Sequence, residues 1–181
     1  MDALHNRVVA VILCALIVAA SSVVGGGMTL GQLRAQTEAV FTLGSQGGAG
    51  IQADLNEIAA QSFNITVIAG RYLQPDYPGI LRVHGARHAL NDAGSPREKH
   101  RAVQEVLGAA NMLRSTLDSL DLSVQDQNLL ASCMVEINSR LVLIASSPYN
   151  QAAFSFNQTL GRFPANILGR AAGIRPLELF E

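Results

Sequence analysis

The sequence predicts an all-α protein: an antiparallel bundle of long helices preceded by one N-terminal transmembrane or signal helix. Hydrophobic residues make up 49% of the 181 residues, yet aromatics are only 5% and Trp is absent. Ala, Leu, Ile and Val must therefore fill the core, which suits helices. No segment alternates apolar and polar residues over the length of a strand. Three segments instead repeat apolar residues every three or four positions, the spacing of one helix face.

The N-terminal segment is directed to a membrane. Its apolar run begins at Val8, ends at Val24 and contains no charged residue. A helix of this length reaches about 26 Å, a little short of a hydrocarbon core of about 30 Å. A cleaved signal peptide is the alternative, because small residues at 19–22 would suit signal peptidase. Since Val23 continues the apolar run past these sites, we favour a retained anchor.

The charges that flank this segment give little information on its orientation. Arg7 precedes it and Arg34 is the nearest basic residue after it. A short, slightly basic N-terminus followed by the bulk of the chain fits export. We therefore expect a single-pass protein of the membrane, with most of the chain extracytoplasmic.

The remaining chain is predicted to contain helices separated by short breaks. An amphipathic stretch at 29–43 runs into a glycine-rich tract at 44–50, which is expected to be a linker. An apolar seam then extends over 51–73, and a shorter helix follows at about 80–91. These breaks divide the chain into an anchor or signal segment at 1–28, a stretch plus linker at 29–50 and a helical bundle at 51–181.

Two helix starts carry capping signals. Ser95, Pro96 and Glu98 match a capping box with proline at the first helical position. Ser123 and Asp126 resemble a second cap, with Asp in place of Glu or Gln. The three predicted seams, which need one another to be buried, are Ile51, Leu55, Ile58, Ser62, Ile65, Ala69 and Tyr72; Val103, Val106, Ala110, Leu113, Leu117 and Leu120; and Leu130, Met134, Ile137, Leu141 and Ile144.

The C-terminal region is expected to cover the end of the bundle. Pro148 either kinks the preceding helix or begins a new one that runs to about Leu160. Asn150 and Asn157 are seven residues apart and would share one helix face, where their amides fix helix register. Phe163, before Pro164, is interpreted as an aromatic plug.

The same region resembles the closing signature of the LemA family. The matching residues, which we take as structural, are Tyr149, Asn150, Phe156, Asn157, Phe163, Pro164, Asn166, Gly173 and Phe180. The resemblance extends more loosely back to Gly50. It implies a bacterial protein with one N-terminal membrane segment and long antiparallel helices, whose biochemical activity is undefined. Family members typically carry a basic stretch before an Asp-Leu-x-Pro-Asn-Leu motif, whereas residues 60–65 here keep only the asparagine.

The sequence offers little for catalysis or nucleic-acid binding. The formal charge of −1 lacks the basic excess that nucleic acid requires. No Glu-x-x-His pair of a di-metal bundle occurs, and no nucleophile motif was found. His84 and His88 are one turn apart but lack further ligands, so a surface pair is favoured over a metal site. Cys133 is interpreted as a small buried residue.

We therefore expect no catalytic, cofactor-binding or metal-binding residue. The favoured hypothesis is a non-enzymatic interaction or scaffold module at the cell envelope, whose partners are the lipid bilayer and an unidentified envelope protein. The alternative is a ligand-binding or metal-binding domain, with or without enzymatic activity, exported by a cleaved signal peptide. The arginines at 162, 170 and 175 would contact lipid headgroups if they lie near the bilayer, but a solvated face is favoured. The sequence does not determine the oligomeric state.

Overall fold

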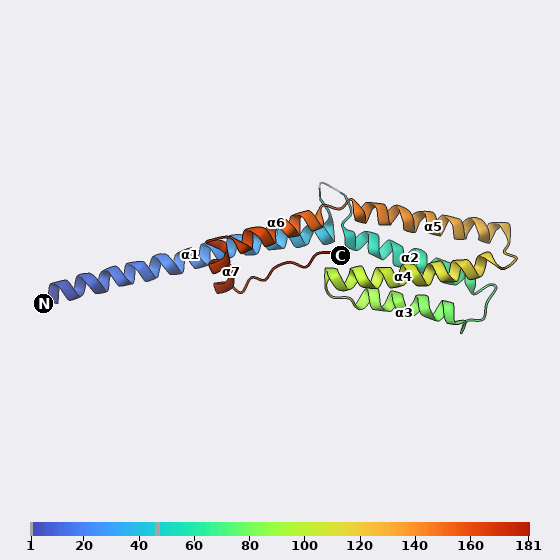
Figure 1. Ribbon diagram of the computed structural model, residues 1–181, viewed down its shortest axis with the longest axis horizontal. Coiled ribbons are helices and arrows are strands. Elements are labelled where there is room, and N and C mark those ends of the chain that lie inside the picture. The colour runs from blue at the N-terminus through green and yellow to red at the C-terminus, as the bar shows by residue number, and fades with distance from the viewer. Residues whose placement is uncertain (1, 46–47) are drawn as a thin grey trace. The chain divides into compact units, whose positions relative to one another are not determined.

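A computed structural model describes residues 2–45 and 48–181, in which every regular element is a helix (Figure 1). The prediction of an all-α protein with an apolar N-terminal helix is confirmed. The helices are α1 (Asp2–Leu43), α2 (Ile51–Ala69), α3 (Pro78–Asp92), α4 (Pro96–Asp118), α5 (Val124–Ala145), α6 (Tyr149–Gly161) and α7 (Ala165–Ala171). They form two compact units. The first unit contains residues 2–38 and 151–177, and the second contains residues 39–150 and 178–181.

Helix α1 continues without a break across the predicted boundary at residue 28. The three glycines at 25–27 weaken a helix, each by about 1 kcal/mol relative to alanine. They are nevertheless suited to close packing: a methyl group at Gly26 would lie 2.6 Å from Leu168 Cδ1, and one at Gly27 would lie 2.9 Å from Ala172 Cβ. Gly26 and Gly27 thus provide the surface of α1 on which Leu168 and Ala172 pack.

The apolar half of α1 is exposed. Within the run that begins at Val8, the side chains of Val11, Leu16 and Val18 are 68%, 63% and 66% exposed. In the second half of the helix, Leu30 and Thr37 are buried in the first unit. The exposed run is therefore the part of α1 that lacks a protein surface to cover it.

The predicted glycine-rich break follows α1. The helix ends at Leu43, and Gly44 adopts a φ of +82°, the left-handed conformation in which glycine commonly ends a helix. Residues 44, 45 and 48–50 are not helical, and Gln46 and Gly47 of the predicted linker lie outside the described residues. The helix break predicted at this tract is therefore present in the part that the structure describes.

The second unit is organised around α2, which contacts α3, α4 and α5. Six of the seven residues predicted for its seam are buried, from Ile51 to Ala69. The helix ends at Ala69, earlier than the predicted residue 73, because Gly70 caps it and a turn carries the chain through Tyr72. Tyr72, the seventh seam residue, is only half-buried and has a polar role described below.

Both predicted caps are present. Ser95 accepts a hydrogen bond from the amide of Glu98, and the Glu98 carboxylate accepts one from the amide of Ser95 at 3.1 Å, which completes the capping box of α4. These backbone bonds, led by one from the amide of Gly94, lower the pKa of Glu98. The predicted α4 seam is buried from Val103 to Leu117, while the later members of the α5 seam are half-buried.

The region after Pro148 begins a new helix, which resolves the choice between a kink and a start. Helix α6 follows directly, and Ala153, Phe156 and Leu160 form its buried face in the first unit. The prediction that Phe163 plugs the end of the protein is wrong, since this side chain is 80% exposed. Phe163 lies in the turn between α6 and α7, whereas Leu160, in the last turn of α6, is buried.

Candidate functional site

The first unit holds its C-terminal segment through Asn157. The Asn157 side chain donates from Nδ2 to the carbonyl of Leu177 at 2.8 Å and accepts at Oδ1 from the amide of Leu177 at 2.7 Å. One amide thereby satisfies both backbone groups of one residue, as a neighbouring strand would. The Leu177 side chain is buried. The Asn157 amide therefore bonds to the backbone of the tail and not to a facing helix.

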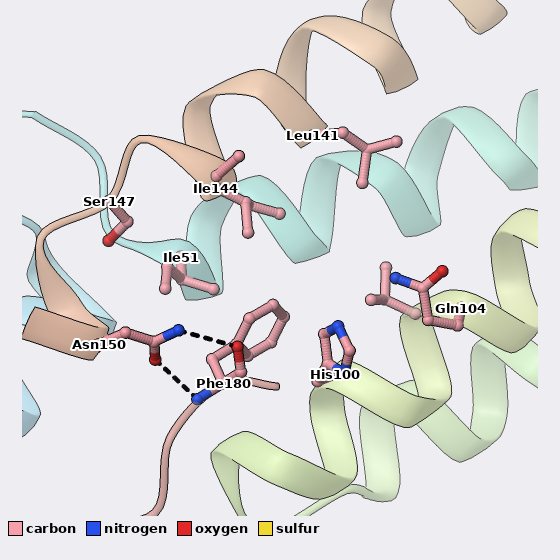
Figure 2. A pocket seen from close by; sticks show the side chains of 10 residues that line it. Ile51, His100, Gln104, Leu141, Ile144, Ser147, Asn150 and Phe180 are labelled. Atoms are coloured by element: carbon pink, nitrogen blue, oxygen red, sulfur yellow. Dashed lines mark hydrogen bonds between the residues drawn. The ribbon is translucent and has the colours of Figure 1, made fainter. Parts of the chain in front are cut away.

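The second unit repeats this arrangement with Asn150. Its Nδ2 donates to the carbonyl of Phe180 at 3.0 Å, and its Oδ1 accepts from the amide of Phe180 at 2.8 Å (Figure 2). The Tyr149 hydroxyl donates to the carbonyl of Glu178 at 2.7 Å. The ring of Phe180 is buried and lies 5.9 Å from that of Phe41. Sequence analysis found the asparagines but not their partners in the tail.

Phe180 also closes one side of a cavity in the second unit (Figure 2). The cavity has a volume of about 280 Å³, and its apolar wall comes from Ile51, Val103, Leu141 and Ile144. The His100 ring meets the Phe180 ring edge-on at a centroid distance of 5.0 Å. Figure 2 shows His100 and Gln104 on α4, across the cavity from Ser147 and Asn150.

The chemistry available in this cavity is limited. It is slightly smaller than typical ligand pockets, which start at about 300 Å³. The side-chain amide of Asn150 is hydrogen-bonded to the backbone of Phe180. The polar side chains that remain to bind a ligand are therefore those of His100, Gln104 and Ser147. A charged groove of about 430 Å³ adjoins it at His100 and is lined also by Arg101 and Glu178. The arrangement suits a small apolar guest with one polar end.

A buried carboxylate, Asp126, organises the turn before α5. Its Oδ2 accepts hydrogen bonds from the Tyr72 hydroxyl at 2.6 Å and from Ser123 Oγ at 3.0 Å, while its Oδ1 is paired with Arg71. The Tyr72 hydroxyl in turn accepts from the amide of Ser123 at 3.0 Å. The hydrogen bond from Tyr72, followed by those from Ser123 and Arg71, lowers the pKa of Asp126 against the opposing effect of desolvation.

The cluster around Asp126 has a structural role, and the sequence predicted only the cap within it. The predicted cap exists, because Ser123 Oγ accepts from the amide of Asp126 at 3.1 Å. Asp126 does not bond back to Ser123 in the manner of a capping box, however, and instead joins α5 to the turn after α2. Only the three-dimensional proximity of Tyr72 and Arg71 reveals this.

A second buried carboxylate, Asp54 on α2, pairs with Arg140 on α5. Arg140 Nη1 lies 3.3 Å from Asp54 Oδ1, and Arg140 Nη2 lies 2.6 Å from Glu136 Oε1. The hydrogen bonds to Glu136 and Asp54 raise the pKa of Arg140. Asp54 falls between apolar seam residues, so the seam pattern gave no signal for this ion pair.

The two histidines singled out by the sequence lie on the exposed face of α3. His88 Nδ1 is 3.0 Å from Asp92 Oδ2, and the His84 ring lies 6.0 Å from that of Phe63. Across residues 2–45 and 48–181, no group of three or more His, Cys, Asp or Glu side chains is placed to hold a metal ion. Cys133 is buried, as predicted, and burial raises the pKa of its thiol.

The remaining signature residues surround α7 in the first unit. Gly173 has a φ of +70°, and the amide of the next residue, Ile174, donates to the carbonyl of Gly169 at 2.8 Å. The signature therefore carries glycine where the chain leaves α7 in a left-handed conformation. The Oδ1 atom of Asn166 is buried without a hydrogen-bond partner among the described residues and lines a small cavity with Arg170.

Among the residues that the structure describes, two segments have the length and composition of a membrane span, namely Val9–Leu43 and Val124–Gly161. The second is broken at Pro148, and its α5 part buries Leu130 and Ile137 within the second unit. No family model and no curated protein matches this sequence.

Proposed function

We propose that this chain is a divergent LemA-like protein of the bacterial cell envelope, held to the bilayer by α1. In this proposal the second unit is an antiparallel helical bundle that acts as a non-enzymatic interaction module. Most of the chain lies on the extracytoplasmic side of the membrane. Its partners are the bilayer and an envelope protein.

The main support for the proposal is the exposed apolar run of α1. Burying a large aliphatic side chain is worth about 1.5–3 kcal/mol, so a helix that exposes Val11, Leu16 and Val18 to water is strongly disfavoured. Soluble proteins rarely present an apolar surface of this extent. A bilayer covers every side of such a helix, whereas a protein partner would cover one or two.

The non-enzymatic role is supported by how the second unit uses its ionisable groups. Asp126 is held by Tyr72, Ser123 and Arg71, and Asp54 by Arg140. Each pair joins two segments of the unit instead of facing a cavity. Catalytic acids and bases are usually found together in a cleft with displaced pKa values, which is not the arrangement of these groups.

The membrane role is tested by fractionation of bacteria that express the full chain with a C-terminal tag. We expect the protein to resist carbonate extraction, to keep its original N-terminus and to be digested by protease added to spheroplasts. An N-terminus that begins near residue 20 would instead support the cleaved signal peptide. Recovery in the soluble fraction with the original N-terminus would contradict both forms of the proposal, whereas recovery there with the shortened N-terminus would contradict the anchor alone.

The interaction role is tested by purification of the same tagged chain in mild detergent after crosslinking in cells. A partner recovered repeatedly, and lost when exposed residues of the second unit are substituted, would support it. Repeated failure to recover any partner, under conditions that retain a known envelope complex, would count against it.

The cavity in Figure 2 favours one second candidate, the binding of a small amphiphile. Its apolar wall and the imidazole of His100 suit an acyl chain that ends in a carboxylate. Octanoate is a suitable probe, since saturable binding raises the melting temperature. We expect the shift to be lost in His100→Leu if this function is correct, while Zn²⁺ serves as the probe for the metal-binding alternative.

A further inference from the structure

Helix α7 packs on α1 directly after the apolar run. Leu168 lies against Gly26, Ala172 lies against Gly27, and Gly169 lies close to both Leu160 and Leu30. The guanidinium of Arg34 donates to the carbonyl of Arg175 at 3.2 Å, which fixes the segment after α7 one to two turns farther along α1. These contacts lie within the first unit and set the level of α7 along the helix axis.

If α1 is the anchor, the position of α7 along the axis of α1 coincides with the expected edge of the bilayer. A hydrocarbon core of about 30 Å takes about 20 residues at 1.5 Å each. Counted from Val8, such a span ends at Gly27. Helix α7 is thereby placed at the boundary between hydrocarbon and headgroups.

The α6–α7 turn exposes apolar side chains at this boundary. Phe163 is 80% exposed and Ile167 is 58% exposed. Aromatic and aliphatic residues of this kind are typical of segments that lie in the interface, about 5–10 Å deep, with basic residues beside them.

The charge of the same segment complements a phospholipid surface. Residues 151–177 contain Arg162, Arg170 and Arg175 and no Asp or Glu, although the whole chain has a net charge of −1. Among the described residues, the guanidinium of Arg162 bonds only to the neutral side chain of Gln158, at 3.1 Å. Within residues 2–45 and 48–181, the side chains of Arg170 and Arg175 have no ion pair or hydrogen bond. All three guanidinium groups are thus available to phosphate oxygens.

We propose that the α6–α7 turn is a second membrane contact of the first unit, in which Phe163 and Ile167 enter the interface and the three arginines bind anionic phospholipid headgroups. This inference rests on the proposed role of α1 as the anchor. It assigns a lipid-binding surface to residues that are far from the anchor in the sequence. A bilayer contact also explains why the aromatic residue of the turn is outside the packed face.

The absence of Trp from the chain gives a direct test. The full-length protein is reconstituted into vesicles whose acyl chains carry bromine, and single-tryptophan variants report contact with lipid by quenching. Phe163→Trp tests the turn and Leu13→Trp tests the anchor. Phe154→Trp is the matched control, because Phe154 is also an exposed aromatic but precedes Phe163 by nine residues in the sequence, about 13 Å back towards the N-terminus of α6.

We expect strong quenching for Leu13→Trp, clear quenching with a blue-shifted emission for Phe163→Trp, and neither for Phe154→Trp. If Phe163→Trp behaves like Phe154→Trp while Leu13→Trp is quenched, the inference is overturned and the anchor stands. If Leu13→Trp is not quenched, the anchor itself fails. Protection of the turn in native membranes, without quenching in vesicles, would assign it to a protein partner and also overturn the inference.

The arginines are tested in the Phe163→Trp background by the addition of phosphatidylglycerol to phosphatidylcholine vesicles. Each basic residue near an anionic surface favours the bound state by about fivefold. Arg170→Gln should reduce the gain in quenching, whereas Arg82→Gln, an exposed arginine of the second unit, should leave it unchanged. Equal quenching with and without the anionic lipid would overturn the headgroup assignment.

Discussion

The two units of this protein differ in how far they bury their apolar residues. In the second unit the seams of α2 and α4 are buried, and the carboxylates Asp54 and Asp126 are each neutralised by an arginine. In the first unit, α1 leaves its longest apolar run exposed and buries only its second half. The second unit therefore buries its predicted seams in its own core, whereas the apolar run of the first unit has no protein surface over it.

One substitution made in both units tests this contrast most strongly. Leu113 of α4 is fully buried, so Leu113→Ala should lower the free energy of unfolding by about 2–5 kcal/mol through lost burial and a cavity. Leu16→Ala in α1 should change it by less than about 0.5 kcal/mol. Urea unfolding in detergent measures both, with Met112→Ala as the exposed neighbour of Leu113. Equal effects at the two leucines would remove the distinction between the units.

A charge placed in the exposed run addresses the lipid phase directly. Leu16 is the midpoint of residues 8–24, where an arginine costs about 2.5–3.5 kcal/mol for insertion. Leu16→Arg should therefore reduce the carbonate-resistant fraction by about 100-fold at equilibrium. Leu81→Arg on α3 replaces a similarly exposed leucine and should leave that fraction unchanged. An unaffected membrane fraction in Leu16→Arg would contradict a bilayer around α1.

The contrast also explains which features the sequence predicted. Seams, caps and breaks follow from short-range patterns, so residues such as Ile58, Ser95 and Gly44 were interpreted correctly. Tertiary partners have no local pattern. Asp126 looked like a simple cap because Tyr72 and Arg71 approach it only after the chain folds.

The same limitation applies at the C-terminus. The spacing of Asn150 and Asn157 showed a shared helix face, but not that each amide pairs with the backbone of an extended tail. Phe163 was interpreted as a plug at the end of the bundle because it is aromatic and precedes Pro164, whereas Phe180 is buried and Phe163 is not. Whether an aromatic residue points inward depends on the direction of a turn, which the residue type does not specify.

The tail gives a test within the first unit, where the contacts are polar. Asn157→Leu removes both hydrogen bonds to Leu177 and leaves its backbone amide and carbonyl without partners, which should cost about 1–3 kcal/mol. Hydrogen exchange should then become faster at Leu177. Gln158→Leu is the control, because Gln158 is the exposed neighbour and bonds only to Arg162. Unchanged protection in Asn157→Leu would show that side-chain burial of Leu177 alone holds the tail.

The smallest effect is expected at Asp126 in the second unit, since the paired Arg71 side chain is 52% exposed and solvent screens the ion pair. The hydrogen bond from Tyr72 leads the causes that lower the pKa of Asp126 in the folded state. A lowered pKa means that the folded protein binds this proton less readily than the unfolded chain. The stability that Asp126 provides is then complete above the unfolded pKa of about 3.9 and is lost as the pH falls through the folded pKa.

The difference in urea midpoint between the wild type and Asp126→Asn should accordingly be largest near neutral pH and shrink below about pH 4. Asp118→Asn is the matched control, because Asp118 pairs with Arg114 at 3.4 Å on an exposed surface of the same unit. Its midpoint should stay close to that of the wild type, because an exposed ion pair contributes little to stability. A difference for Asp126→Asn that grows on acidification would mean that the carboxyl group is bound in its protonated form, and the assignment of Tyr72 and Arg71 as partners of a carboxylate would then be wrong.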